Sequence, residues 1–315
     1  MLSEPQLQDV TYALAASPDF ARGGVCFAAR ASGLYRSDDG GRTWQSAYAT
    51  LDLPSPLPTM AVGLSPDFAS DRTVFAGVAG GVLRSRDGGR HWETVAQPSP
   101  QPAVTVLAIS PHYAHDGLAF AGTAEDGVFC STDWGAHWAP WNFGLLDLNV
   151  LCLAVSPRFA EDATVFIGAE TGIFRSANGG RTWREVAFPT EFSPVLCLAL
   201  SPDYPRDGVL LAGTEAHGLF RSEDGGRKWA CLSEDVLGEA VVNQIVLAPK
   251  FPAKPDVLAL LNEALLISRD GGQTWSAWKL GLDLAPGATC LAAPQGLAAR
   301  APLLIGRVEG GVLRL

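Results

Sequence analysis

The chain has 315 residues, 47% of them hydrophobic and 18% charged, and a formal net charge of −10. This composition is typical of a well-buried globular protein and excludes a disordered chain. The acidic balance argues against a phosphate-tracking surface for nucleic acid and against docking on anionic lipid. Residues 1–9 lack the basic and apolar segments of a signal peptide, and no apolar run is long enough to span a membrane. We therefore expect a cytoplasmic protein that binds no nucleic acid and inserts into no membrane.

One unit recurs along the whole chain. In its first copy an apolar strand ends in a Ser-Pro turn (ALAASPDF), a second strand follows (VCFAA), and then a third (GLYRS) leads into the octet SDDGGRTW. A short fourth strand is expected after the octet. The octet recurs so that its tryptophan returns every 45–48 residues, at Trp44, Trp92, Trp138, Trp183, Trp229 and Trp275. Four short antiparallel strands in each repeat of about 46 residues predict the blades of a β-propeller.

The number of blades follows from the innermost strands. Seven are predicted, near Leu14, Val62, Leu107, Leu153, Leu198, Val246 and Leu291. The seventh unit reaches only its third strand at residues 311–315, so we expect residues 1–9 to supply the outer strand of that blade. Closure of this kind removes exposed sheet edges. The predicted fold is all-β: a single domain over residues 1–315, forming one seven-bladed propeller of four-stranded antiparallel blades.

The octet has residues suited to a tight hairpin turn. Its third residue can accept N–H groups of its own turn, its glycines permit a positive φ, and its tryptophan can pack over the blade. The acceptors are Asp39, Asp87, Asp133, Asn178, Asp224 and Asp270. We assign these residues and the six tryptophans a structural role.

The six octets resemble the Asp-box (BNR-type, bacterial neuraminidase) repeats, and the resemblance extends over essentially the whole chain. In families with this motif the Asp box lies at the periphery, away from any active site, so it implies fold and not catalysis. Such propellers include sialidases, xyloglucan-cleaving glycosidases, sortilin-type receptors and propellers similar to the photosystem II assembly factor. The Arg-Ile-Pro motif of sialidases is missing, and the compact ring with SPDF-type turns is most similar to the assembly-factor group. That resemblance implies a binding scaffold.

A series of acids occupies the turn between the second and third strands of blades three to seven. They are Glu125, Glu170, Glu215, Glu263 and Glu309. Five such side chains around one rim would make a negative mouth. Three interpretations stay open: solvated turns copied by duplication, a site for a cation or basic partner, and paired carboxylates for glycoside hydrolysis.

Blade three adds two aromatic residues after its octet, Trp141 and Phe143. They could form a platform for sugar or peptide, or could pack against the next blade. Four histidines lie in turns of blades two and three, at His91, His112, His115 and His137. A metal would need two or three of them to converge, and surface loop histidines are the more common case. The cysteines form no C-x-x-C pair. We expect no metal and no cofactor.

An arginine precedes the octet serine in four units, at Arg36, Arg84, Arg175 and Arg221, and Arg314 has the equivalent position in the seventh unit. We expect these side chains to lie between blades, with an anion site as the alternative. No nucleophile–base pair or phosphate loop is evident, so a catalytic residue is not assigned and a non-enzymatic role is favoured. The predicted function is a binding or assembly scaffold for protein partners, using the rim glutamates, Trp141 and Phe143. The alternative is a carbohydrate-binding or glycoside-hydrolase propeller.

Overall fold

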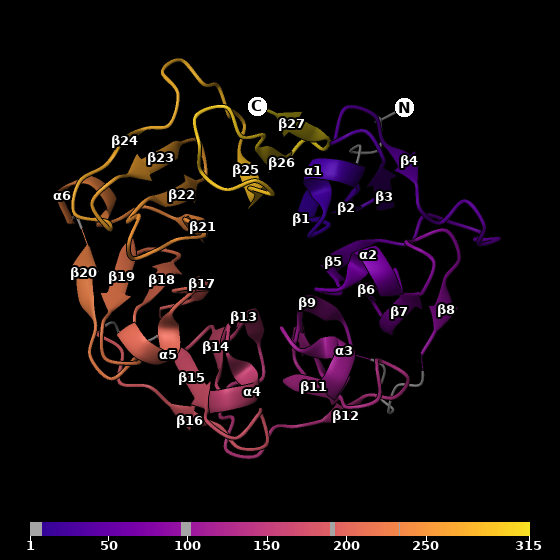
Figure 1. The fold of residues 1–315 in the computed structure, drawn as a ribbon, viewed down its shortest axis with the longest axis horizontal. Coiled ribbons are helices and arrows are strands. Elements are labelled where there is room, and N and C mark those ends of the chain that lie inside the picture. The colour runs from indigo at the N-terminus through magenta and orange to yellow at the C-terminus, as the bar shows by residue number, and fades with distance from the viewer. Residues whose placement is uncertain (1–7, 96–101, 190–192, 233) are drawn as a thin grey trace, which may run out of the picture.

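Seven antiparallel sheets stand around a central axis in the computed structural model, which describes residues 8–95, 102–189, 193–232 and 234–315 (Figure 1). Six sheets have four strands and one has three, and within each sheet the strands follow chain order from the axis outward. The predicted all-β, seven-bladed propeller is confirmed.

The two inner strands of each blade carry most of its apolar residues. The innermost strands are β1 (Thr11–Ala16), β5 (Thr59–Leu64), β9 (Val104–Ile109), β13 (Val150–Val155), β17 (Val195–Leu200), β21 (Val242–Leu247) and β25 (Ala288–Ala292). The second strands are β2 (Cys26–Arg30), β6 (Val74–Val78), β10 (Ala119–Thr123), β14 (Val165–Ala169), β18 (Leu210–Thr214), β22 (Val257–Leu261) and β26 (Leu304–Arg307). The second strands are almost wholly buried because each is covered by neighbouring blades on both faces. Their continuous apolar runs follow from this double burial.

The two outer strands are shorter and more polar. The third strands are β3 (Gly33–Ser37), β7 (Gly81–Ser85), β11 (Val128–Ser131), β15 (Ile173–Ser176), β19 (Leu219–Ser222), β23 (Leu265–Ser268) and β27 (Val312–Arg314). The fourth strands are β4 (Gln45–Ser46), β8 (Glu93–Thr94), β12 (Ala139–Pro140), β16 (Arg184–Glu185), β20 (Ala230–Leu232) and β24 (Ser276–Ala277). Each fourth strand follows an Asp box directly and makes only two or three residue pairs with the third.

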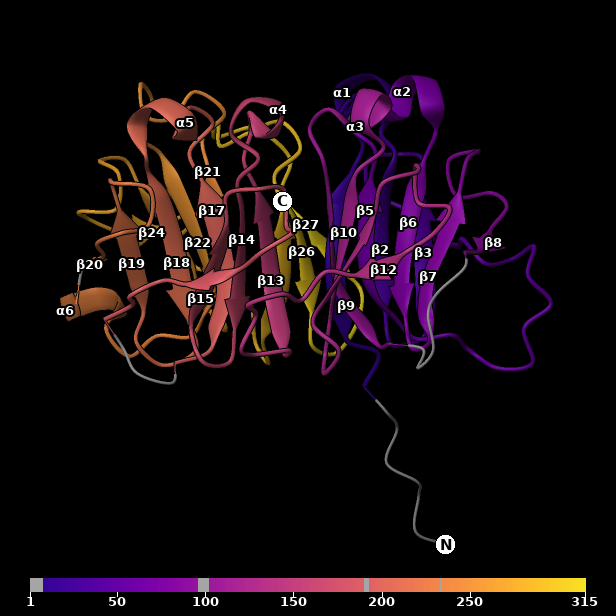
Figure 2. The same cartoon turned by 90° about the horizontal axis from the view of Figure 1, so that it is seen from below.

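The Ser-Pro turns predicted from the sequence contain, in blades one to five, a single turn of helix. These helices are α1 (Phe20–Gly23), α2 (Phe68–Asp71), α3 (Tyr113–Asp116), α4 (Phe159–Asp162) and α5 (Tyr204–Asp207), while α6 (Glu234–Leu237) lies in the connection from blade five to blade six. Each of the first five begins with a buried aromatic residue. The hydroxyl of Ser65, which precedes α2, donates to Asp71 at the end of α2 at 2.5 Å and so closes the turn. Figure 2 shows α1 to α5 together on one face of the ring. No helix in the described ranges is long and apolar enough to cross a membrane.

Blade seven meets blade one and closes the ring. The Thr11 hydroxyl donates to the Gly311 carbonyl at 3.0 Å, and Arg314 Nε donates to the Gly40 carbonyl at 3.0 Å. The Thr289 hydroxyl donates to the Thr11 carbonyl. Within the described residues this blade has three strands. The predicted fourth strand falls on residues 1–9, of which 1–7 lie outside the described residues, while Gln8 and Asp9 are not in a strand.

Candidate functional site

The loops divide between two faces of the ring. The turn between the first and second strands and the Asp-box turn of the same blade are joined by a backbone hydrogen bond, as from Gly40 N to Gly24 O and from Gly179 N to Ala163 O. The Asp boxes therefore share the face that carries α1 to α5 (Figure 2). The opposite face is formed by the turns between second and third strands and by the connections between blades.

The Asp box is a closed set of local hydrogen bonds. In blade one, Asp39 accepts from the Ser37 hydroxyl at 2.8 Å, from the N–H groups of Arg42 and Thr43 at 2.9 Å, and from the Thr43 hydroxyl at 2.6 Å. The Ser37 hydroxyl in turn accepts from Gly41 N at 2.9 Å. These bonds, led by that from the Thr43 hydroxyl, hold the pKa of Asp39 well below its usual range. The carboxylate is thus fully occupied in holding its own turn.

Two histidines take the place of this threonine. His91 Nδ1 lies 2.6 Å from Asp87 Oδ2, and His137 Nδ1 lies 2.6 Å from Asp133 Oδ2. Burial acts to raise the pKa of Asp133, but the bonds from the His137 ring and N–H and from the Ser131 hydroxyl outweigh it and lower the pKa to about 2. Across the described residues, no three His, Cys, Asp or Glu side chains are grouped so that they could hold a metal ion.

Acid should weaken the propeller through these carboxylates. Because the folded pKa of Asp133 lies below its unfolded value, its contribution to stability is present above about pH 4 and is lost as the pH falls toward 2. We expect Asp133→Asn to reduce the slope of unfolding free energy against pH between pH 4 and 2, measured by urea unfolding at each pH. Blade four already uses an amide here: Asn178 Oδ1 accepts from the Thr182 N–H at 3.0 Å.

The control for this measurement is Asp52→Asn, on an exposed loop. This substitution should leave the slope as it is in the wild type. Equal slopes for Asp133→Asn and the wild type would contradict the assigned role of the box carboxylate.

The five predicted rim glutamates all lie in turns on the face opposite the Asp boxes. Glu125, Glu170, Glu215, Glu263 and Glu309 are all exposed. None makes an ion pair within the part of the chain that the structure describes. Exposed carboxylates of this kind contribute negative potential to the face. They lack the contrast in burial that would separate an acid from a base.

The central channel is lined by the innermost strands. Its cavity of about 350 Å³ is bordered by backbone and by side chains such as Thr105, Asn243 and Cys197, with no carboxylate among the lining residues. Its amides are already used between blades, since Gln244 Nε2 donates to the Leu291 carbonyl at 2.8 Å and Gln244 Oε1 accepts from the Leu291 N–H at 2.6 Å. Among the described residues that line the channel there is therefore no carboxylate pair for glycoside hydrolysis.

The two extra aromatic residues of blade three, Trp141 and Phe143, differ in burial and in the face of the ring toward which they lie. Trp141 is half-buried: the Arg181 guanidinium lies 5.7 Å from its ring centre, and the ring lines a groove of about 570 Å³ shared with His112 and His115. Phe143 is 78% exposed. The structure thus places Trp141 toward the Asp-box face and leaves Phe143 outside it, so the two do not form one platform.

Phe143 belongs to an inter-blade connection with further exposed apolar residues, which the sequence analysis did not single out. Residues 142–149, called the 142–149 connection below, join blade three to blade four. Leu146 on it is also 78% exposed, and Leu148 is 39% exposed. Three exposed apolar side chains on one short segment differ from the isolated ones expected on any surface.

This connection is tied to the blades at both ends. Asn142 Oδ1 accepts from Val128 N at 2.8 Å, and the Phe143 carbonyl accepts from Trp183 N at 2.8 Å. Asp147 Oδ2 accepts from both the N–H and the hydroxyl of Thr171 at 2.9 Å. Its apolar side chains therefore project from a fixed backbone.

Two of the third-strand arginines lie between blades, as predicted. Arg84 Nη1 donates to the Trp134 carbonyl at 2.7 Å, and Arg221 Nη1 donates to the Gly271 carbonyl at 2.8 Å. Each acceptor belongs to the Asp box of the next blade, so these side chains link neighbouring blades.

Comparison with known proteins agrees with this geometry. The model of the BNR/Asp-box repeat matches residues 35–46 and 266–277. No curated protein sequence gives a match.

Solved structures match over nearly the whole chain. One is the extracellular domain of a one-component system from B. thetaiotaomicron, at 13% identity and TM-score 0.73, covering 98% of this chain and 38% of that one. The GH74 xyloglucanase from Xanthomonas campestris has 18% identity and TM-score 0.72, with 98% and 52% covered. YCF48 bound to D1 peptide has 17% identity and TM-score 0.71, with 98% and 94% covered. The chain thus spans about half or less of the first two proteins but nearly all of the third.

Identities this low show the fold alone. Taken with the blade count and the box geometry, they lead to one conclusion: the chain is a seven-bladed β-propeller carrying BNR/Asp-box repeats, with the fold found in YCF48 and in the GH74 propellers.

Proposed function

We propose that this propeller is a non-enzymatic binding scaffold for a protein partner and that the 142–149 connection is the centre of its binding surface. One observation carries the proposal: Phe143 and Leu146 are each 78% exposed on a segment that is hydrogen-bonded to both flanking blades. Exposed apolar side chains held in place lose little conformational entropy when a partner covers them. A few well-packed side chains near the centre of a protein interface commonly supply most of its binding free energy.

The surroundings of the connection suggest the charge of the partner. Gly127 N donates to the Leu148 carbonyl at 2.9 Å, which places the connection against the turn that carries Glu125 and Asp126. Asp147 holds Thr171, the neighbour of Glu170. Apolar side chains bordered by exposed carboxylates suit a segment with apolar residues between basic ones.

The comparisons support a protein partner. YCF48, which has the same fold over nearly its whole length, has been solved with a bound peptide. The carbohydrate alternative has the GH74 likeness in its favour. However, no carboxylate is among the described residues that line the channel, and the Arg181 guanidinium lies 5.7 Å from the centre of the Trp141 ring.

The test replaces Phe143 and Leu146 together by serine. Loss of two anchor side chains should weaken capture of the partner about tenfold or more. The measurement is quantitative affinity capture from extract of the source organism, followed by titration of the captured protein. The matched control is Leu280→Ser, because Leu280 is 90% exposed on a different inter-blade connection.

Both variants should keep the wild-type melting temperature, since neither changes a buried side chain. Equal capture by the double variant and by the wild type would overturn the assignment of the surface. Equal loss in Leu280→Ser would show that the binding is not specific to the 142–149 connection.

A further inference from the structure

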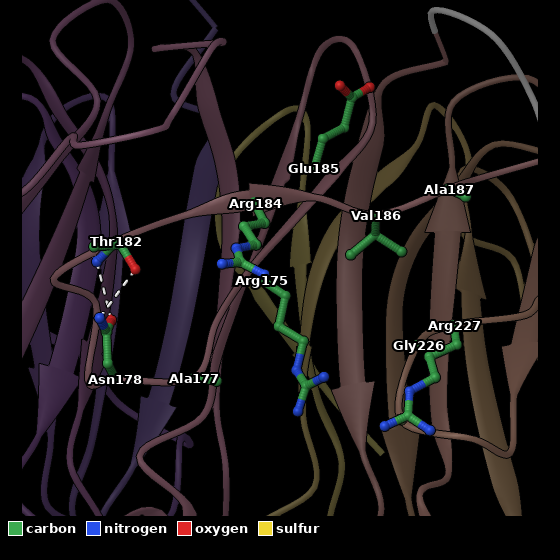
Figure 3. Close-up of a pocket in the computed structure, with 11 residues that line it drawn as sticks. Arg175, Ala177, Asn178, Thr182, Arg184, Glu185, Val186, Ala187, Gly226 and Arg227 are labelled. Atoms are coloured by element: carbon green, nitrogen blue, oxygen red, sulfur yellow. Dashed lines mark hydrogen bonds between the residues drawn. The ribbon is translucent and has the colours of Figure 1, made fainter.

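A second surface lies between blades four and five and carries the opposite charge. It is a groove of about 590 Å³ whose lining includes Arg175, Arg184 and Arg227 (Figure 3). Arg184 and Arg227 are exposed and Arg175 is half-buried. No ion pair involves any of the three within the described residues. Three arginines without acid partners are unexpected in a chain of net charge −10.

Two of these arginines face each other across a strand pair. In blade four, Arg175 on β15 pairs in register with Arg184 on β16. The same position in the other four-stranded blades holds other pairs: Arg36–Gln45, Arg84–Glu93, Cys130–Ala139, Arg221–Ala230 and Ile267–Ser276. Like charges directly opposite each other destabilise a sheet. An anion bound between them would remove that repulsion.

Arg175 also lacks the carboxylate partner that the arginines at the same position of blades one, two and five have. Arg36 pairs with Asp38, Arg84 pairs with Glu93 at 2.7 Å, and Arg221 pairs with Glu223 at 2.7 Å. The residue that corresponds to Asp38 and Glu223 in blade four is an alanine, Ala177. Among the described residues, Arg175 has no carboxylate or carbonyl partner, and its guanidinium lies over the Phe166 ring at 5.7 Å.

The Asp box beside the groove is the one without a carboxylate. Asn178 stands where the five other boxes have aspartate. Its amide donates to the Thr182 hydroxyl at 2.9 Å, so these two side chains satisfy each other (Figure 3). The groove thus has a neutral residue or an arginine at three positions where at least one other blade has an acid: Ala177, Asn178 and Arg184.

The one carboxylate that remains belongs to Glu185. Figure 3 shows its side chain directed away from the guanidinium groups of Arg175 and Arg227. Three arginines and one glutamate leave a local charge of +2 in the groove lining.

We propose that this groove binds a phosphoryl group, either free or carried on a larger molecule. A phosphoryl dianion balances the local charge and offers three oxygens to several guanidinium forks. A single carboxylate would engage one fork and leave the other arginines uncompensated. The groove volume falls in the range of small-ligand sites and exceeds what inorganic phosphate alone requires. The arginine groove is separate from the 142–149 connection. The proposal of a phosphoryl site does not depend on the binding function proposed for that connection.

The test titrates the whole chain with inorganic pyrophosphate by isothermal titration calorimetry at low salt. The wild type should bind with a dissociation constant below about 1 mM. Arg184→Glu copies the Arg84–Glu93 pair of blade two and should weaken binding at least tenfold while the protein stays folded. Arg227→Gln should also weaken it severalfold. The matched control is Arg42→Gln, which changes the equivalent Asp-box arginine of blade one and should leave binding unchanged.

Two further titrations, with inorganic phosphate and with O-phosphoserine, distinguish a free phosphate ion from a phosphoryl group carried on a larger molecule. Binding of inorganic phosphate comparable to that of pyrophosphate indicates a free-anion site, whereas tighter binding of O-phosphoserine than of inorganic phosphate indicates a carried group. Absence of pyrophosphate binding in the wild type would overturn the proposal. It would equally be overturned by unchanged affinity in Arg184→Glu, or by a loss in Arg42→Gln as large as in Arg184→Glu. The melting temperatures of Arg227→Gln and Arg42→Gln should equal that of the wild type, and that of Arg184→Glu should be equal or higher because the substitution removes a like-charge pair, which excludes unfolding as the cause.

Discussion

Replacing Gly168 by leucine is expected to lower the free energy of unfolding by about 3 kcal/mol or more. Gly168 lies on β14 where blade four meets blade five. A Cβ atom at this position would lie 2.5 Å from Cys152 Sγ, 2.6 Å from the Val195 carbonyl oxygen and 2.9 Å from Val195 Cγ1. Val195 is fully buried, so neither blade can move aside without losing packing.

Blade six shows how a large side chain can occupy this position. Leu260 is its register equivalent, since Leu260 pairs with Gln244 as Gly168 pairs with Cys152. The next blade there begins its inner strand with Ala288, which corresponds to Val195. Volume removed from one blade is thus compensated by volume added to its neighbour.

Val195→Ala should therefore restore part of the stability lost in Gly168→Leu, although alone it leaves a cavity and is destabilising by about 1–3 kcal/mol. The measurement is a double-mutant cycle by urea unfolding, followed by tryptophan fluorescence. Strictly additive effects of the two substitutions would show that the two side chains do not share one space.

Gly135→Ala is expected to be destabilising by about 2–4 kcal/mol, through two effects that can be separated. Gly135 in the blade three Asp box has φ +77°, which costs a residue with a side chain about 1–2 kcal/mol. Its added Cβ would also lie 2.3 Å from Phe75 Cε1 of blade two. Phe75 is fully buried and packs edge-on against Trp138 at 5.9 Å, so the ring has no free space to enter.

The backbone effect has its own control in Gly88→Ala. Gly88 has φ +76°, but its added Cβ would meet only Phe68 Cζ at 3.5 Å, an ordinary contact. This variant should show the backbone cost alone. Phe75→Leu combined with Gly135→Ala should recover the packing part of the loss, as measured by urea unfolding. Equal losses in Gly88→Ala and Gly135→Ala would contradict the role assigned to the Phe75 contact.

The parts of this structure that the sequence predicts correctly are those made by local chemistry. The hydrogen bonds of an Asp box join residues no more than four apart, as from Thr43 to Asp39. The structure of this turn can therefore be predicted from the octet alone. Seven inner strands separated by turn residues then fix the number of blades. The prediction of short turns after the inner strands missed the helical turns because their stability comes from burial of one aromatic residue, such as Phe68, in the blade below.

The candidate sites depend on strand register and on contacts between blades, which no local pattern in the sequence reveals. The need for glycine at position 168 comes from Cys152 on the neighbouring strand and from Val195 in the next blade. Trp141 and Phe143 are two residues apart and of similar chemistry, yet one packs under Arg181 and the other faces solvent. The arginine groove became visible only when the register showed which residue stands opposite Arg175.

The contact of Thr11 with Thr289 and Gly311 has a consequence for how the ring assembles. Contacts between the other neighbouring blades close chain loops of roughly 45 residues, as from Cys152 to Val195, whereas this one closes a loop of 278 residues. Loop-closure entropy rises by about 0.6 kcal/mol for each doubling of length, which makes this contact about 1.6 kcal/mol costlier than its counterparts in an otherwise flexible chain. That penalty disappears when the six preceding interfaces have already curved the chain, because they bring β1 and β25 side by side. Closure of the propeller is therefore cooperative: the contact between the first and last blades depends on all the other blades having formed.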